Sequence, residues 1–304
     1  MAFTASDVKN LREITGVGMM DCKKALTEAD GNIDKAIEYL REKGLAASAK
    51  KAGRIAAEGM AYATVIDGIG VVVEVNAETD FVGKNEKFVD FVKGVAAVVA
   101  KENPADLEAL MDAKYNDTLT VEQQQQEMVL VIGENIKVRR FARFADGVSV
   151  AYVHAGGKIG VLVNLDTDLT YEQVEEAGKD VAMQIAALNP RFWDKTQVTE
   201  EVLEEEKRIM MVQMANDPKM ANKPEQVREK IVMGKLNKFY SENCLLQQEF
   251  VKDNTMTVEK YIASVAKAQG GTITFKDAVR FEKGEGIEKK EENFAAEIAS
   301  MVKG

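Results

Sequence analysis

The sequence predicts an α+β protein built from several modules, and three observations lead to that prediction. Apolar residues recur at helical spacing in three short segments near the N-terminus. Further along, the spacing becomes that of strands, and an order of two strands, helices and one strand occurs twice. The second occurrence contains an inserted helical segment. We therefore expect a helical module and two related α+β subdomains, each with a three-stranded antiparallel sheet.

The N-terminal module is expected to occupy residues 1–45. Its three helices are predicted over residues 4–16, 20–29 and 32–44. Thr4 and Asp7 have the spacing of a capping box, which begins the first helix, and Gly44 is expected to end the third. Residues 46–57 are rich in Ala and Lys with little apolar periodicity, so we interpret them as a partly helical linker.

The first α+β subdomain is expected over residues 58–144, and the second, over residues 145–282, repeats its order. The strands of the first are predicted over residues 60–66, 69–76 and 136–144, and its helices over residues 85–99 and 121–132. Asp67-Gly68 is typical of a hairpin turn between the first two strands. The repeat pairs Ala61-Tyr62 with Ala151-Tyr152, Gly70-Val71-Val72-Val73 with Gly160-Val161-Leu162-Val163, Asn103-Pro104 with Asn189-Pro190, Thr120-Val121-Glu122 with Thr257-Val258-Glu259, and Arg143-Phe144 with Arg280-Phe281.

An insertion interrupts the second subdomain. The spacing from the matched proline to the matched threonine is 16 residues in the first copy and 67 in the second, so 51 residues are inserted. We place the insert at residues 195–245 and expect an antiparallel helical hairpin whose first helix begins at Thr199. A C-terminal docking segment is expected over residues 283–304. The apolar face of its predicted helix consists of Phe294, Ile298 and Met301.

Composition and charge exclude several classes of function. Forty basic and fifty acidic residues give a net charge of −10, which disfavours broad binding to nucleic acid or to an anionic membrane and favours a protein partner. No apolar run approaches the roughly 18 residues of a membrane span, and the N-terminus does not read as a signal peptide, so we expect a cytosolic protein. Cys22 and Cys244 lack CxxC spacing and are expected to be reduced thiols.

The single histidine excludes most metal and nucleophilic chemistry. His154 alone cannot supply a histidine pair or an HExxH helix, and no GxSxG motif accompanies it. The sequence contains no G-x-x-x-x-G-K-[ST] phosphate-binding motif, so we expect no direct binding of nucleotide. We expect neither a metal nor a cofactor.

Five features occur in a specific order along the chain. They are Gly16-Val17-Gly18-Met19-Met20-Asp21-Cys22-Lys23-Lys24-Ala25-Leu26, Thr79-Asp80-Phe81-Val82, Tyr152-Val153-His154 leading to Lys158-Ile159-Gly160-Val161-Leu162-Val163, the helical insert, and Arg280-Phe281-Glu282 with Gly284-Glu285-Gly286-Ile287-Glu288. Together they closely resemble the bacterial elongation factor Ts family over essentially the whole chain. The resemblance implies guanine nucleotide exchange on elongation factor Tu, in which GDP release is accelerated without covalent chemistry so that GTP can bind.

The resemblance assigns a role to Thr79-Asp80-Phe81-Val82. It implies that this segment enters the GTPase domain of the partner near its magnesium site and displaces the ion. Phe81 is then a wedge between helices, Asp80 is its acidic neighbour, and Thr79 and Val82 shape the tip. A rigid apolar ring suits this role because it can occupy a pocket that exists only in the nucleotide-free arrangement. From the residues alone, an alternative is that Thr79 or Asp80 caps a helix while Phe81 packs inside.

Further partner contacts follow from the same resemblance. The N-terminal module resembles the three-helix ubiquitin-associated fold and is implied to grip the GTPase domain. The candidate contacts in it are Lys9, Arg12, Met19, Met20 and Lys23. The alternative places the two methionines in the core and leaves the lysines solvated. His154 is a candidate contact with a different domain of the partner, and the alternative is a structural hydrogen bond at a strand end.

The sequence is also compatible with two functions other than nucleotide exchange. A ubiquitin-associated-like adaptor without exchange activity only tethers its partner, so residues 1–45 alone would retain most of the affinity. A carboxylate hydrolase would use acids such as Glu74 and Glu78, which also fit ordinary surface carboxylates on one strand face. The sequence leaves the assembly open among a one-to-one pair, a homodimer and a two-by-two complex with the GTPase.

Overall fold

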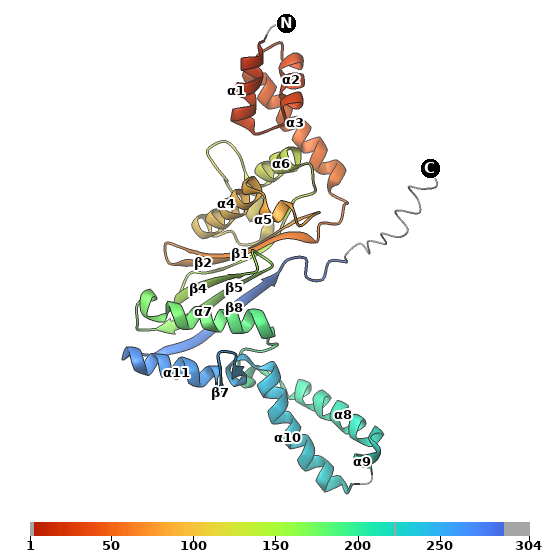
Figure 1. Ribbon diagram of the computed structural model, residues 1–304, viewed down its shortest axis with the longest axis vertical. Coiled ribbons are helices and arrows are strands. Elements are labelled where there is room, and N and C mark those ends of the chain that lie inside the picture. The colour runs from red at the N-terminus through yellow and green to blue at the C-terminus, as the bar shows by residue number, and fades with distance from the viewer. Residues whose placement is uncertain (1–2, 222, 289–304) are drawn as a thin grey trace.

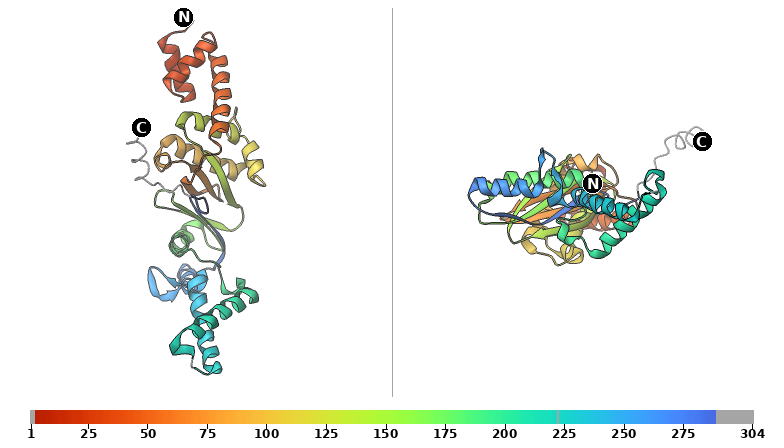
Figure 2. Two further views of the ribbon diagram at one scale, coloured as in Figure 1. Left: turned by 90° about the vertical axis from the view of Figure 1, so that its right-hand side faces the viewer. Right: turned by 90° about the horizontal axis from the view of Figure 1, so that it is seen from below.

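A computed structural model describes residues 3–221 and 223–288 of the chain. Its modules follow one another along one long axis (Figure 1). A three-helix module lies at one end, two stacked sheets with helices on their outer faces form the middle, and a helical hairpin projects at the other end. The side view shows the same succession (Figure 2). The predicted α+β class is confirmed.

The N-terminal module consists of three helices. They are α1 (Ala5–Thr15), α2 (Met19–Glu28) and α3 (Ile33–Lys51). The predicted capping box is present, because the Thr4 side chain accepts from the Asp7 N–H while the Asp7 carboxylate accepts from the Thr4 N–H. Gly16 follows α1 in the left-handed conformation, which ends the helix as predicted. The fully buried residues of this module are Leu11, Cys22, Ala25, Leu26 and Ala36.

The prediction that Gly44 ends the third helix is wrong, because α3 continues to Lys51. At Gly44 this helix packs against α6 (Val121–Ile132), and a β-carbon there would lie 3.3 Å from the Gln126 carbonyl oxygen. A glycine inside a helix costs about 1 kcal/mol relative to alanine, and here it permits close approach of two helices. The N-terminal module is therefore joined to the first subdomain by helix packing as well as by the chain.

Each subdomain contains the predicted three-stranded antiparallel sheet. The first has the order β1 (Glu58–Ile66), β2 (Ile69–Ala77) and β3 (Lys137–Phe144). The second has the order β4 (Val148–His154), β5 (Ile159–Thr167) and β8 (Ile273–Glu282). In each, the middle strand follows the first through a hairpin and the third strand returns after helices.

Both sheets carry a β-bulge at the same place, which supports the internal repeat. In the first sheet the register shifts after Glu74 and leaves Arg139 of β3 as the extra residue. In the second it shifts after Asn164 and leaves Lys276 of β8 as the extra residue. Glu74 and Asn164 stand equally far from the matched glycines that begin the repeated Gly-Val runs. The two copies therefore share the order of their elements and also the position of a β-bulge.

The two sheets pack face to face through mostly small side chains. Their shared core contains Ala61, Ala63, Val72, Leu162 and Phe281. Gly160 permits this close packing, because a β-carbon there would lie 3.1 Å from the Ala61 backbone. The outer faces are covered by α4 (Glu86–Glu102) and α6 on the first sheet, and by α7 (Tyr171–Leu188) and α11 (Val258–Gln269) on the second. The result is four layers in the middle of the molecule (Figure 1).

Several short elements are absent from the sequence prediction. They are α5 (Leu107–Asp112), the strand pair β6 (Glu249–Phe250) and β7 (Asp253–Thr257), and the 3-10 turns η1 (Val82–Lys84), η2 (Lys195–Gln197) and η3 (Leu245–Gln247). Each is too short to display helical or strand periodicity, so pattern analysis could not find it.

The insert forms the predicted helical hairpin, with one short additional helix at its turn. Its elements are α8 (Glu200–Asn216), α9 (Pro218–Ala221) and α10 (Glu225–Asn243). Thr199 caps α8 as predicted, accepting from the Val202 N–H at 3.4 Å. The two ends of the insert meet where the Leu245 N–H donates to the Phe192 carbonyl at 2.9 Å. The hairpin therefore leaves the second subdomain at one narrow base and points away from the N-terminal module (Figures 1 and 2).

The chain beyond β8 returns toward the beginning of β1. The Lys283 ammonium pairs with Glu58 at 2.5 Å, and Gly284 has a φ of 71° with no room for a side chain, since a β-carbon would lie 2.0 Å from the Ala57 carbonyl oxygen. The predicted C-terminal helix face of Phe294, Ile298 and Met301 lies outside the described residues. Within the described ranges, no helix is both long and apolar enough to span a bilayer.

Candidate functional site

The candidate site begins with the tip segment, residues 78–85, which connects β2 to α4. Phe81 stands at its outer edge with 80% of its surface exposed, whereas its neighbour Val82 is 5% exposed and belongs to the core of the first subdomain. Thr79 is half-buried and Asp80 is exposed. The alternative in which Phe81 packs inside the protein is therefore wrong.

The loop that follows α6 holds the beginning of the tip segment. Glu134 accepts hydrogen bonds from the N–H groups of Glu78 and Thr79 at 3.1 and 3.0 Å, and from the Thr79 hydroxyl at 2.7 Å. In return, the Asn135 N–H donates to the Glu78 carboxylate at 2.6 Å. The Asn135 side chain also donates to the Arg54 carbonyl at 2.8 Å. These bonds fix the backbone just before Phe81.

The end of the tip segment is held equally well. The Asn85 N–H donates to the Val82 carbonyl at 2.9 Å, and the Asn85 side chain caps α4. Gly83 lies against the first strand, where a β-carbon would come within 2.9 Å of the Gly59 carbonyl oxygen. Phe81 is therefore an exposed aromatic ring on a backbone that is fixed on both sides. Such a ring loses little conformational freedom when a partner binds it.

The methionine loop, residues 16–20, forms a second exposed apolar surface. Met19 and Met20 are 53% and 75% exposed, so the alternative that places them in the core is wrong. Ile14, at the end of α1 beside this loop, is 57% exposed. The other predicted contacts of the module, which are also exposed, are Lys9, Arg12 and Lys23. The module thus presents soft apolar side chains with cationic ones on the neighbouring helices.

One hydrogen bond joins the methionine loop to the start of α4, which directly follows the tip segment. Lys87, in the first turn of α4, donates through its ammonium group to the Gly16 carbonyl at 2.9 Å. A pocket of about 330 Å³ opens between the two modules here, lined by residues that include Ile14, Lys87 and Tyr115. The exposed side chains of both motifs therefore belong to neighbouring surfaces.

His154 ends β4 and is exposed. Its Nδ1 lies 2.9 Å from the Tyr152 hydroxyl. The turn that follows packs on β1, because the Ala61 N–H donates to the Gly157 carbonyl at 2.8 Å. The same end of β1 contacts the tip segment through Gly59. His154 therefore lies near the end of the β1–β2 pair from which the tip extends.

Glu74 is fully buried, so its interpretation as a surface carboxylate is wrong. Its oxygens accept from Arg139 at 2.9 Å, Arg140 at 2.5 Å, Asn76 at 3.0 Å and the Gly284 N–H at 2.8 Å. The β-bulge at Arg139 lets two consecutive arginines reach one carboxylate, since a regular strand would point them to opposite faces. Burial raises the pKa of Glu74, but these hydrogen bonds outweigh it and hold the pKa below its ordinary value.

Neither predicted acid is arranged for hydrolysis. Glu78 lies beyond the end of β2, where it accepts from the Asn135 N–H and pairs with Arg54 at 3.5 Å. Glu74 is committed to the network that joins the sheet to the segment after β8. Across residues 3–221 and 223–288, no group of three or more His, Cys, Asp or Glu side chains is placed to hold a metal ion.

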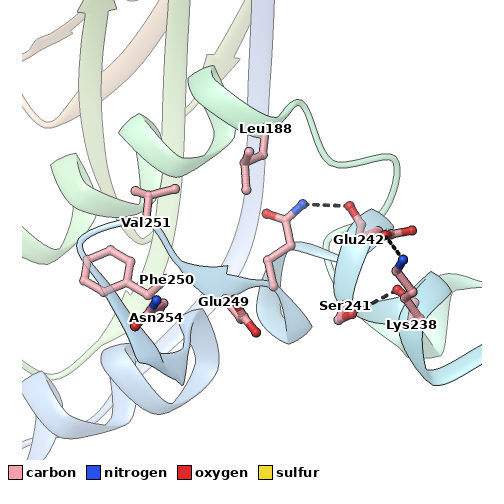
Figure 3. Close-up of a pocket in the computed structure, with 9 residues that line it drawn as sticks. Leu188, Lys238, Ser241, Glu242, Glu249, Phe250, Val251 and Asn254 are labelled. Atoms are coloured by element: carbon pink, nitrogen blue, oxygen red, sulfur yellow. Dashed lines mark hydrogen bonds and ion pairs between the residues drawn. The ribbon is translucent and has the colours of Figure 1, made fainter.

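A pocket of about 620 Å³ lies elsewhere, at the base of the hairpin (Figure 3). Its polar groups satisfy one another: the Gln248 side chain donates to the Glu242 carbonyl at 3.1 Å, and Lys238 pairs with the Glu242 carboxylate at 3.4 Å. Leu188 and Val251 supply apolar surface on its wall (Figure 3). None of the site residues predicted from the sequence lines this pocket.

Sequence reasoning missed two residues that organise the site. Glu134 and Lys87 act on segments that are 55 and 71 positions away in the chain, so no local pattern reports their roles. The only local signal near Glu134 is the left-handed Gly133 that ends α6 and turns the next residue toward the tip.

Comparisons with known proteins agree with these motifs. The family described as Elongation factor TS matches residues 78–285 of this chain. Three relatives bear the name Elongation factor Ts. The relative from Syntrophotalea carbinolica is 49% identical over 100% of both chains. The relative from Clostridium botulinum (strain Eklund 17B / Type B) is 48% identical over 98% of this chain and 99% of its own. The relative from Clostridium perfringens (strain SM101 / Type A) is 49% identical over 98% of each.

Proposed function

The chain belongs to the elongation factor Ts family, and from this premise we propose that it releases GDP from elongation factor Tu by inserting Phe81. It is a translation elongation factor. It binds the GDP-bound GTPase in the cytosol, displaces magnesium and accelerates GDP release so that GTP can bind. No covalent bond is made or broken in this cycle, and the chain itself holds no nucleotide.

The observation that carries this proposal is the 80% exposure of Phe81 on a fixed backbone. Full burial of such a side chain stabilises a complex by about 2–3 kcal/mol. If the receiving pocket exists only in the nucleotide-free GTPase, this free energy favours that state alone. Asp80 enters beside the ring and places a negative charge near the magnesium site, while Thr79 and Val82 keep the tip in shape.

The N-terminal module supplies affinity in this proposal. Met19 and Met20 bury their exposed surface on the GTPase domain, and Lys9, Arg12 and Lys23 add cationic contacts at the rim. His154 contacts a second domain of the partner from the edge of the other sheet. Because Lys87 joins the module to the first turn of α4, which directly follows the tip segment, docking of the methionine loop positions Phe81 for insertion.

Met20→Ala is expected to weaken association with elongation factor Tu by about 10- to 100-fold, because the methionine is 75% exposed before binding and its burial contributes about 1.5–3 kcal/mol. Titration calorimetry measures the dissociation constant. Met233→Ala is the matched control, since this hairpin methionine is 61% exposed at the other end of the molecule. An unchanged dissociation constant for Met20→Ala would remove the methionine loop from the contact surface.

Dissociation constants for two forms of elongation factor Tu distinguish nucleotide exchange from simple tethering. An exchange factor binds nucleotide-free elongation factor Tu more tightly than the magnesium–GDP form, and by reciprocity it weakens GDP binding by the same factor. We expect calorimetric titrations of the two forms to differ by that factor. An adaptor binds both forms equally, so equal dissociation constants would overturn the proposed function.

Removal of the hairpin is expected to leave exchange intact and to alter assembly. Residues 199–240 project from one narrow base, where the Leu245 N–H meets the Phe192 carbonyl at 2.9 Å, so a short Gly-Ser linker can replace them. The GDP release rate tests exchange, and light scattering of the free factor and of its complex tests assembly. A folded deletion variant that cannot exchange nucleotide would contradict this assignment.

A further inference from the structure

We propose that Glu134 is a positioning residue for nucleotide exchange, holding the backbone of residues 78–79 so that Phe81 faces the GTPase. This inference rests on the proposed function of Phe81. Glu134 lies outside all the motifs that identify the tip, and its role follows from its contacts alone.

The Glu134 carboxylate is fully engaged with the tip segment. One oxygen accepts from the Glu78 and Thr79 N–H groups at 3.1 and 3.0 Å, and the other accepts from the Thr79 hydroxyl at 2.7 Å. Hydrogen bonds to an ionised acceptor are about twice as strong as those between neutral groups. Three such bonds converge on two consecutive residues, and Phe81 follows two positions later.

The tip segment has little else to fix its direction at this end. Within the described residues, no hydrogen bond or ion pair holds the Asp80 side chain, and the Phe81 ring is 80% exposed. The backbone at Thr79 therefore sets where the ring points, together with the turn at Val82 that holds its other side. Without Glu134, the Asn135–Glu78 bond would still tether the segment, but the Thr79 N–H and hydroxyl would lose their partner.

The loop that carries Glu134 is itself well anchored. Gly133 ends α6 with its N–H bonded to the Val129 carbonyl at 3.0 Å, and Ile136 is 1% exposed in the core. Lys51, the last residue of α3, donates to the Gly133 carbonyl. The backbone on both sides of Glu134 is therefore held in place, by the end of α6, by the buried Ile136 and by Lys51 of α3. We expect Glu134 to keep its position when the tip segment moves.

The test compares Glu134→Ala with Glu134→Gln in the full chain. Glutamine keeps an oxygen for the two N–H groups and an amide that can donate to the Thr79 hydroxyl, whereas alanine keeps neither. We expect Glu134→Ala to lower the maximal rate of GDP release about tenfold, which is less than the roughly 100-fold cost of a 1 Å misplacement, because the Asn135–Glu78 bond still tethers the segment. The factor concentration at half-maximal rate should change less than about threefold, and Glu134→Gln should recover most of the rate.

Two further measurements separate positioning from general stability. Hydrogen exchange at the Glu78 and Thr79 amides should rise in Glu134→Ala while exchange within α6 stays unchanged. Thr79→Val, which removes the hydroxyl but keeps the shape, should lower the rate non-additively with Glu134→Ala. Glu122→Ala is the matched control, because this exposed glutamate stands at the opposite end of α6.

The outcomes distinguish this inference from the proposed function. If the wild-type chain does not accelerate GDP release, the proposed function fails, and rate-based support for Glu134 fails with it. If the wild-type chain does accelerate release and Glu134→Ala matches its maximal rate, the inference about Glu134 is overturned. A rate that falls in Glu134→Ala and in Glu134→Gln alike, without faster amide exchange at Thr79, would also overturn it.

Discussion

Replacing Phe81 by alanine is expected to lower the maximal rate of GDP release from elongation factor Tu by about 30- to 100-fold. The estimate follows from about 2–3 kcal/mol for burial of a phenylalanine that is available only in the nucleotide-free state, at about 1.4 kcal/mol for each factor of ten. The dissociation constant for the magnesium–GDP form should change much less, because the ring is buried only in the nucleotide-free state and the N-terminal module still docks. Stopped-flow release of a fluorescent GDP at saturating factor measures the rate, and titration calorimetry measures the affinity.

The matched control for Phe81→Ala is Leu188→Ala. Leu188 is 48% exposed but lies at the end of α7, beside the hairpin base and away from the tip. It should change neither the rate nor the affinity. Equal losses of rate and of affinity for the magnesium–GDP form in Phe81→Ala would contradict a wedge role and would make Phe81 an ordinary docking residue.

Glu74→Ala is expected to produce the largest loss of stability, about 3 kcal/mol. The change leaves Arg139 and Arg140 without their shared carboxylate and leaves the Gly284 N–H unpaired in a buried place. A melting temperature about 6 °C lower follows for a chain of this size, and scanning calorimetry measures it. Glu102→Ala is the control, because its surface pair with Lys101 at 3.3 Å contributes at most about 1 kcal/mol.

The stability that Glu74 contributes is expected to depend on pH. Burial raises its pKa, but hydrogen bonds from Asn76, the Gly284 N–H and the two arginines lower it below the unfolded value of about 4.3. The contribution is therefore complete above that unfolded pKa and is lost as the pH falls through the lower pKa of the folded state. The melting-temperature gap between wild type and Glu74→Ala should be widest near neutral pH and close in acid. A gap that stays constant in acid would contradict this origin.

Local sequence patterns and the internal repeat were enough to predict most helices and strands of the fold. The capping box at Thr4 and the cap at Thr199 are short-range signals, and they begin helices where expected. Gly44 shows where such signals fail. A glycine ends a helix when the chain needs a left-handed residue, but here it serves the approach of α3 to α6, which depends on a residue 82 positions away.

The residues of the candidate site also differ in how far the sequence could predict them. Phe81, Met19 and Met20 could be selected from motifs, but their exposure depends on how the tip and loop are held in the folded protein. Glu74 was misread because period-2 spacing says which face a residue occupies and not whether another sheet covers that face. The second sheet and the segment after β8 bury it. Glu134 could not be selected at all, since its partner Thr79 is distant in sequence.

Release of a fluorescent GDP from elongation factor Tu, at fixed magnesium with excess unlabelled GDP, decides whether the chain is an exchange factor. The chain is added in amounts well below those of the GTPase. We expect each molecule of the chain to release many molecules of GDP, and we expect Phe81→Ala to lower this stimulated rate by about 30- to 100-fold. A folded, binding-competent chain that leaves the spontaneous rate unchanged would contradict the proposed function.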